Sequence, residues 1–194
     1  RSVVREFEVV GLASSDASHP ARTVNISKPW FVSPLHELVC SLMGSIAREL
    51  GAEMMIVKGP MLKQQGLRQQ EHSGDVDLWM RAADIERMNA PLEAWGWAQG
   101  GDLWERYGLG HSVTFRPNVW GCEVDVHRRM TGIGADDATA VELLLQQSTD
   151  ACFAGVNIRV PRPEAHAVIA GLHMMRPEPG RARPGGVASA TAKC

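Results

Sequence analysis

The stretch HSGDVDLWM, residues 72–80, decides how the rest of the chain is interpreted. Its two aspartates, Asp75 and Asp77, alternate with the apolar residues Val76, Leu78 and Met80. Side chains two residues apart on a β-strand point to the same side. The alternation therefore predicts a strand over residues 75–80 with both carboxylates on one face. Two like charges held side by side repel each other unless a cation lies between them.

A divalent cation such as Mg²⁺ fits this arrangement, because it prefers oxygen ligands and commonly binds one or two carboxylates together with substrate phosphates. Two such ions, roughly 3.5–4 Å apart, can activate an attacking oxygen and stabilise a leaving phosphate oxygen. That site needs a third carboxylate from a neighbouring strand. CEVDVHRRM, residues 122–130, offers one, since Asp125 shares a predicted strand face with Glu123 and His127. If the two strands are neighbours, Asp125 completes a triad with the first two aspartates.

A purely structural role for these charges stays open at this level. Alternating charged and apolar residues are typical of any half-solvated antiparallel sheet, and D-x-D alone is a weak motif. The order of a Lys-Gly turn, a D-x-D strand and a later acidic strand that ends in histidine favours a functional site.

The residues before the D-x-D strand predict a helix, a strand and a tight turn. Ser33 followed by Pro34 indicates a helix start, and Gly51 ends the helical spacing. The predicted buried stripe comprises Leu35, Leu38, Val39, Leu42, Met43, Ile46, Ala47 and Leu50. Met54–Val57 then reads as a short buried strand, and Lys58-Gly59-Pro60 leads into a short helix that ends near Gly66.

Helices and strands also alternate after residue 80. We expect Asp84 to cap a helix in which Ile85, Met88, Leu92 and Trp95 share a face, with a break at Pro91. Further strands are predicted at 112–115, 119–127 and 156–160, and further helices at 139–147 and 163–175. This alternation indicates the α/β (α+β) class, with a mixed β-sheet flanked by helices and a short C-terminal helical part.

Three segments are expected along the chain. Residues 1–32 form an N-terminal extension with a possible strand at Val3–Val10, and residues 33–176 form the domain. Residues 177–194 are rich in Pro, Gly and Arg without apolar periodicity, so we expect a flexible tail there.

The composition of the 194 residues is that of a globular protein, with 44% hydrophobic and 22% charged residues. The net charge of −2 implies no general surface for polyanions. Four scattered cysteines without a C-x-x-C pair favour free thiols in a reducing compartment, so we expect a cytoplasmic protein. No apolar run has the length of a membrane span, and we expect no membrane partner.

Three motifs, IVKGPML (56–62), HSGDVDLWM (72–80) and EVDVHRR (123–129), resemble the uncharacterised nucleotidyltransferase family of the polymerase-beta-type superfamily. RVPRPEAHAVIAGLHMMR (159–176) is similar to the helix that follows in that family, with its recurring late histidine. The resemblance covers roughly residues 35–176. It implies a nucleotidyltransferase-like mixed sheet.

The resemblance also implies a metal-binding set. Asp75 and Asp77 would bind the metal ions, two Mg²⁺ being expected, and Asp125 would be the third carboxylate. These three aspartates are also the expected catalytic residues. Judged from the residues rather than from the resemblance, His127 would contact phosphate, hold Asp125 in orientation, or be a partly buried histidine of the sheet.

The same resemblance implies a nucleotide cradle. Lys58 and Gly59 stand where the superfamily places a turn that approaches the phosphates. Judged from the residues alone, Ser73 would either touch the phosphates or be an ordinary loop residue. Gly74, without a side chain, would let the backbone come close. For Lys58, a surface position after a buried strand is the competing interpretation.

The implied reaction moves a nucleoside monophosphate from an NTP, with ATP as the expected nucleotide, to a hydroxyl or phosphate acceptor and releases pyrophosphate. We expect a small molecule, peptide or protein as acceptor rather than a nucleic acid. Two alternatives stay open. Glu71 stands where relatives often carry arginine, and the C-terminal region is short, which favours a non-catalytic nucleotide- or peptide-binding module. A phosphotransferase could use the same carboxylates.

Other residues have weaker claims to a site. Trp79 could stack on a base or pack in the core. His166 and His173 share a face of the last predicted helix, where we expect packing or capping rather than metal binding. Cys122 has no positioned base, and GPMLKQQG lacks the ending of a phosphate-binding P-loop.

Overall fold

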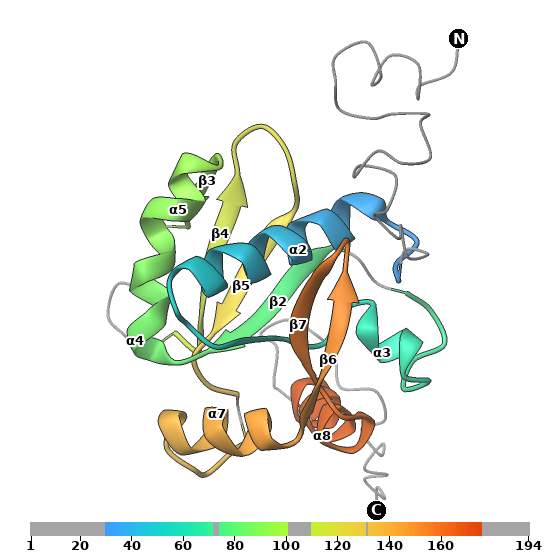
Figure 1. The fold of residues 1–194 in the computed structure, drawn as a ribbon. Helices are drawn as coiled ribbons and strands as arrows, with labels where there is room; N and C mark the ends of the chain where they lie inside the picture. Colours follow the sequence, from blue (N-terminus) through green and yellow to red (C-terminus); the bar gives the residue numbers. More distant parts are fainter. Residues whose placement is uncertain (1–29, 72–73, 101–109, 131, 176–194) are drawn as a thin grey trace, which may run out of the picture.

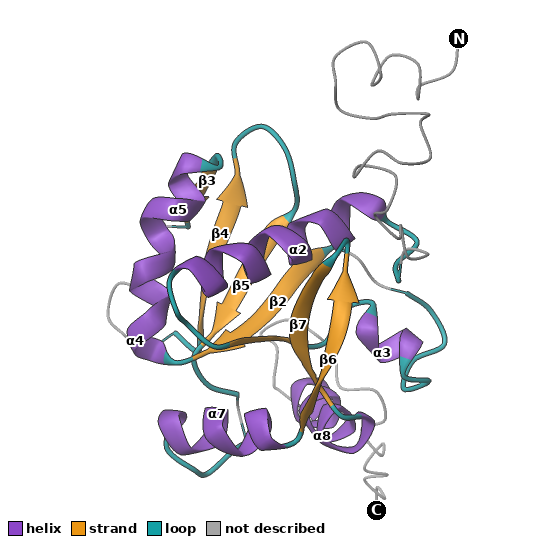
Figure 2. Cartoon of the chain, viewed as in Figure 1, coloured by secondary structure: helices purple, strands orange, loops and turns teal. Residues whose placement is uncertain are grey.

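The computed structural model describes residues 30–71, 74–100, 110–130 and 132–175. The possible strand at Val3–Val10 and the tail from residue 177 lie outside the described residues. Within the described ranges the chain forms one mixed sheet flanked by helices, which confirms the α+β class (Figure 1, Figure 2). The strands are β1 (Met54–Ile56), β2 (Asp75–Met80), β3 (Trp97–Gln99), β4 (Ser112–Pro117), β5 (Glu123–His127), β6 (Ser148–Phe153) and β7 (Val156–Pro161).

The strand order places the two acidic strands side by side at the centre of the sheet. The order is β3-β4-β5-β2-β1-β7-β6. β2 pairs with β5 in parallel and with β1 antiparallel, while β1 pairs with β7 in parallel. β4–β5, β3–β4 and β6–β7 are antiparallel pairs. The strand predicted from residue 119 begins only at Glu123, because Gly121 takes a left-handed backbone (φ 100°) and breaks the extension before it.

The first helix, α2 (Pro34–Glu49), is confirmed, and the Ser33 hydroxyl caps it by accepting the His36 N–H at 3.3 Å. Its buried face differs from the predicted stripe, since Leu35 and Leu38 are exposed. Glu37 is buried instead, because its carboxylate accepts the backbone N–H groups of Phe31 and Ala154. With Glu37 held inward by these bonds, Leu35 and Leu38 of the first turns of α2 face outward.

The segment after β2 is broken into three short pieces, α4 (Ala82–Ile85), a 3₁₀ turn η2 (Glu86–Met88) and α5 (Asn89–Ala94). The expected break is present, since the ring of Pro91 would clash with the carbonyl of Arg87 in a continuous helix. The expected cap is wrong: Asp84 lies inside α4, where its side chain pairs with Arg87 at 2.7 Å. Trp95 is also exposed rather than part of the buried face.

Helices cover both faces of the sheet. α2 lies across one face, and α7 (Asp137–Gln146) and α8 (Pro163–Met175) lie on the other side, with the short helix α3 (Met61–Gln64) beside α8 (Figure 1). The larger apolar core lies under α2 and includes Val76, Leu78 and Val126. A smaller core on the α7 and α8 side includes Met55, Trp79 and Ile169. Across the described ranges, every helix is too short or too polar to span a bilayer.

Candidate active site

Asp77 and Asp125 are neighbours across the parallel pair of β2 and β5. The register pairs Asp77 with Asp125 and Asp75 with Glu123, so the expected arrival of Asp125 beside the D-x-D strand is confirmed. Both aspartates lie on the face that carries Trp79, since residues two apart on a strand share a face. Asp77 is buried and Asp125 is half-buried.

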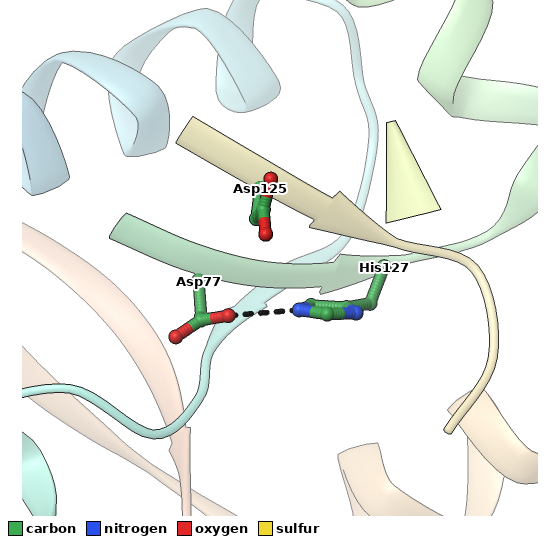
Figure 3. Close-up of side chains that lie close together, drawn as sticks. All are labelled: Asp77, Asp125 and His127. Atoms are coloured by element: carbon green, nitrogen blue, oxygen red, sulfur yellow. Dashed lines mark hydrogen bonds and ion pairs between the residues drawn. The ribbon is translucent and has the colours of Figure 1, made fainter. Parts of the chain in front are cut away.

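A third side chain, His127, joins this pair. Ligand atoms of Asp77, Asp125 and His127 all lie within 4.8 Å of one another (Figure 3). Asp75 is outside this group, although it precedes Asp77 by only two residues. Residues two apart along a strand are separated by roughly 6.6 Å, whereas neighbouring strands lie about 4.8 Å apart. Neighbours across the sheet therefore approach more closely than the two aspartates of the motif do.

His127 donates a hydrogen bond to Asp77. Its Nε2 lies 2.8 Å from Asp77 Oδ1, and because an ionised carboxylate can only accept, the ring nitrogen carries the proton. In the sequence, His127 was expected on Asp125 or on phosphate, but the structure places its ring on Asp77. Asp125 is instead supported by Thr114 of β4, whose hydroxyl donates to Asp125 Oδ1. No sequence motif pointed to Thr114, which faces Asp125 through the antiparallel register of β4 and β5.

Lys58 lies in the interior of the site rather than on the surface. Its ammonium forms an ion pair with Asp77 Oδ1, and both side chains are buried. The backbone of Lys58 is left-handed, with φ 57°, and Gly59 follows with φ 51°. The turn after β1 thus directs the lysine back over the sheet to the aspartate.

Opposing effects act on the pKa of Asp77. Burial raises the pKa, but the hydrogen bond from His127 and the positive charge of Lys58 lower it by more, so the net pKa lies below its usual value. Asp77 is therefore ionised at neutral pH although it is buried. Lys58 balances the charge of Asp77 in this structure, and the second carboxylate, Asp125, lies beside it.

The two carboxylates suit a hard divalent cation. Ligand atoms within 4.8 Å of one another can be bridged by one ion whose bonds are about 2.0–2.5 Å long. Because His127 Nε2 carries the proton donated to Asp77, the histidine in this state orients the carboxylate rather than ligates. Partners that orient a metal ligand in this way are common around metal sites.

Two other residues predicted to bind the nucleotide phosphates, Gly59 and Gly74, lie in the turn after β1 and directly before β2. Gly59 is buried in the turn, and Gly74 is exposed directly before β2. Ser73 lies outside the described residues. Glu71 accepts the N–H of Val32 at 2.8 Å, which ties the segment before α2 to the segment before β2.

Of two weaker candidates, Trp79 is a core residue and Cys122 is partly buried against the core. Trp79 is completely buried and its indole N–H donates to the carbonyl of Arg128 at 3.2 Å, so it packs rather than stacks on a base. Burial, together with the charge of Asp75, raises the pKa of the Cys122 thiol to about 11. A thiol with such a pKa is protonated at neutral pH, whereas the thiolate is the nucleophilic form.

The candidate site is a pair of carboxylates on two central strands of a mixed sheet, beside a buried lysine. Residues 42–180 match the family described as "Uncharacterised nucleotidyltransferase", and the chain belongs to that family. No curated protein matches the sequence.

Solved structures show similarity at low identity. The lincomycin-bound lincosamide antibiotic adenylyltransferase LnuA shares 14% identity over 68% of this chain and 82% of its own, with a TM-score of 0.45. The antibiotic-resistance factor ANT(2'')-Ia shares 16% over 65% and 64%, with a TM-score of 0.43. An antigenic nucleotidyltransferase-like protein from Paracoccidioides brasiliensis shares 14% over 66% and 61%, with a TM-score of 0.44. This chain therefore spans less than two thirds of the latter two proteins.

Proposed function

We propose that this nucleotidyltransferase moves a nucleoside monophosphate from an NTP, with ATP as the donor, to a hydroxyl or phosphate acceptor and releases pyrophosphate. The observation that carries the proposal is the parallel register of β2 and β5, which sets Asp77 beside Asp125 with Lys58 on the same carboxylate. Catalysis of this kind rests on positioning and on neutralisation of charge.

Asp77 and Asp125 are the proposed metal ligands, and Asp75 is kept as a third ligand from the family motif. Bound Mg²⁺ would neutralise triphosphate charge and lower the pKa of a coordinated acceptor oxygen. His127 orients Asp77, and Thr114 orients Asp125. Asp125 takes the proton of the acceptor, since it is the less buried of the two carboxylates.

Lys58 has two possible partners in this scheme. In the structure its ammonium neutralises Asp77. A bound triphosphate offers a second anion, so Lys58 can bind phosphate oxygens in the complex. Gly59, Ser73 and Gly74 would line the same phosphates with their backbone.

The net charge bears on the class of acceptor. A net charge of −2 gives no argument for a nucleic-acid partner, whose backbone is usually held by a basic surface. We therefore propose a hydroxyl or phosphate group on a small molecule, peptide or protein as the acceptor, and a nucleotide as the other partner.

Thermal unfolding tests the nucleotide site. Wild type, Asp75→Asn and Asp77→Asn are compared with ATP plus Mg²⁺, ATP alone and Mg²⁺ alone, with Asp150→Asn as a control for an exposed aspartate of β6. A ligand at about 100 times its Kd adds about 2.7 kcal/mol, which is roughly a 5–10 °C shift for a domain of this size. We expect that shift in wild type and Asp150→Asn only with ATP plus Mg²⁺, and its loss in Asp77→Asn.

Product analysis tests the reaction itself. With water as the default acceptor, nucleotidyl transfer yields AMP and pyrophosphate, whereas phosphoryl transfer yields ADP and phosphate, and ³¹P NMR distinguishes the two. We expect AMP and pyrophosphate, with at least a 10²-fold lower rate in Asp77→Asn, the effect typical of losing one electrostatic contact. Binding without either product, across hydroxyl-bearing acceptors, would support a non-catalytic module instead.

A further inference from the structure

Both ring nitrogens of His166, a residue of α8, form hydrogen bonds within the protein. The side chain is fully buried. Its Nε2 accepts the backbone N–H of Lys58 at 2.6 Å, and its Nδ1 lies 2.6 Å from Gln65 Oε1. A backbone N–H can only donate, so Nε2 is unprotonated and Nδ1 carries the proton. His166 is therefore a neutral imidazole of one defined tautomer.

Gln65 fixes that tautomer from the other side. Its amide nitrogen donates to the carbonyl of Pro161 at 2.7 Å, at the end of β7. The orientation of the amide leaves Oε1 as the acceptor for the proton on His166 Nδ1. Three consecutive hydrogen bonds thus connect β7 to the turn after β1. They run through Gln65, directly after α3, and His166 in α8.

The turn at Lys58, where this series of hydrogen bonds ends, has a strained backbone. Among the described residues other than glycine, Lys58 and Ala154 have positive φ values. A left-handed backbone is unfavourable for a residue with a Cβ atom. A buried backbone N–H also needs a hydrogen-bond partner, because leaving it unpaired costs free energy. His166 supplies that partner where β1 has ended, so it stabilises the very backbone conformation that turns the Lys58 ammonium onto Asp77.

We propose that His166 is a positioning residue, which holds the left-handed turn at Lys58 and thereby places the lysine ammonium for the phosphates of the bound nucleotide. His166 acts through Lys58 and has no nitrogen left for substrate. The inference rests on the proposed nucleotide function only for the phosphate contact, since the hydrogen bond to Lys58 is independent of any ligand.

Other charges around the imidazole agree with a neutral ring. Burial is the largest cause that lowers the pKa of His166, the positive charge of Arg68 beyond α3 adds to it, and Asp77 on β2 opposes both, so that the net pKa is about 4. The Lys58 ammonium is paired with Asp77. At neutral pH the ring therefore stays an acceptor for the Lys58 N–H.

Two substitutions separate the hydrogen bond from the bulk of the side chain. His166→Leu keeps apolar volume but removes the acceptor, whereas His166→Gln can present its amide oxygen near the place of Nε2. His173→Leu is the matched control, because it is an exposed histidine on the same helix. All three are made in the full chain.

The first readout is hydrogen exchange of the Lys58 amide, measured without nucleotide. We expect the amide to be protected in wild type, His166→Gln and His173→Leu, and to exchange roughly ten- to a hundred-fold faster in His166→Leu, the range expected for loss of one hydrogen bond to a buried group. Strand amides of β2 should be unchanged. Equal Lys58 exchange in His166→Leu and wild type would overturn the proposal.

The second readout is the affinity for ATP with Mg²⁺ and the split between KM and kcat. A displaced Lys58 should raise KM in His166→Leu by roughly ten-fold or more, with rescue in His166→Gln to within about three-fold of wild type. If wild type binds no nucleotide, the proposed function fails while the exchange result still decides the role of His166. If wild type binds and His166→Leu binds equally well, the positioning role is wrong.

Discussion

Under α2 the sheet presents Val76, Leu78 and Val126, all buried, whereas its opposite face presents Asp77, Trp79 and His127. Both faces exclude water, but different interactions stabilise them. The α2 face depends on apolar area, which is tolerant of small changes in direction. The α7 and α8 face combines apolar area with charged and polar groups that are stable only when each has its partner.

This difference favours the α7 and α8 face of the sheet as the place of the proposed function. A buried apolar face offers nothing to a charged substrate. On the other face, Asp77 is paired with Lys58 and His127, and both partners are groups that a phosphate or a cation can rearrange. Substitutions on each face can test whether buried apolar area stabilises the α2 face and whether paired charges stabilise the opposite one.

Lys58→Met removes the cation from the buried pair and retains the length of the side chain. We expect a loss of roughly 3–5 kcal/mol in the free energy of unfolding, because Asp77 is left as a buried charge with only His127 as a partner. Urea unfolding at pH 7.5 measures it, with the exposed Lys63→Met as control. Adding Asp77→Asn to Lys58→Met should restore part of the loss. A Lys58→Met protein as stable as Lys63→Met would contradict the pairing.

Leu78→Ala tests the apolar face on the same strand. Leu78 is completely buried in the core under α2, so the truncation should cost about 3 kcal/mol through lost apolar contact and a residual cavity. The exposed Leu143→Ala should change stability by less than about 0.5 kcal/mol. Because no titratable group is touched, the pH dependence of stability should match that of wild type. A changed pH dependence would show that the two faces are coupled.

The free energy of unfolding should decrease as the pH is lowered below about 6.5, because of His166. Its pKa is about 4 in the folded protein and about 6.5 when exposed, so between these values the unfolded chain binds a proton that the folded chain does not. Lowering the pH from 7.5 to 5 should therefore cost wild type about 2 kcal/mol more than His166→Gln, whereas His173→Gln should keep the wild-type slope. Asp77 stays ionised across this window, since its pKa lies below its usual value. Parallel curves for wild type and His166→Gln would refute this prediction.

Gly44→Ala gives the smallest effect of the series and again concerns the α2 face. A Cβ atom at Gly44 would lie 2.6 Å from side-chain carbons of Ile158 on β7, which is too close. We expect roughly 1–2 kcal/mol of destabilisation, since Ile158 can shift by part of the overlap. Gly171→Ala, on α8, meets nothing within 4 Å and should stabilise by up to about 1 kcal/mol. Thermal unfolding of both variants decides the sign.

Local patterns predicted the strands of the site but not its contacts. Alternation in residues 75–80 and 123–127 correctly identifies β2, β5 and the two polar faces. Two short or turn-like strands, β3 and β6, were not predicted. β3 has only three residues, and β6 begins Ser148-Thr149-Asp150, residue types that are common in turns.

The partners within the site depend on register and on packing between distant segments. Lys58 and His127 reach the same oxygen of Asp77 because β1 and β5 lie on either side of β2. A single sequence carries no direct signal for that arrangement, nor for the bond between Lys58 and His166. The D-x-D motif drew attention to Asp75, whereas the sheet brings Asp77 closest to Asp125.

The hydrogen bond between the Lys58 amide and His166 also orders events during synthesis of the chain. The two residues are 108 positions apart. At about 5–20 residues per second, a ribosome needs roughly 5–20 s to add the later one. During that interval the nascent chain already carries its aspartate strand, but the turn at Lys58 has no acceptor for its amide. The turn at Lys58 is thus completed only when α8 has been made, and a chain that ended before α8 would carry Asp77 and Asp125 without the acceptor that holds the Lys58 amide.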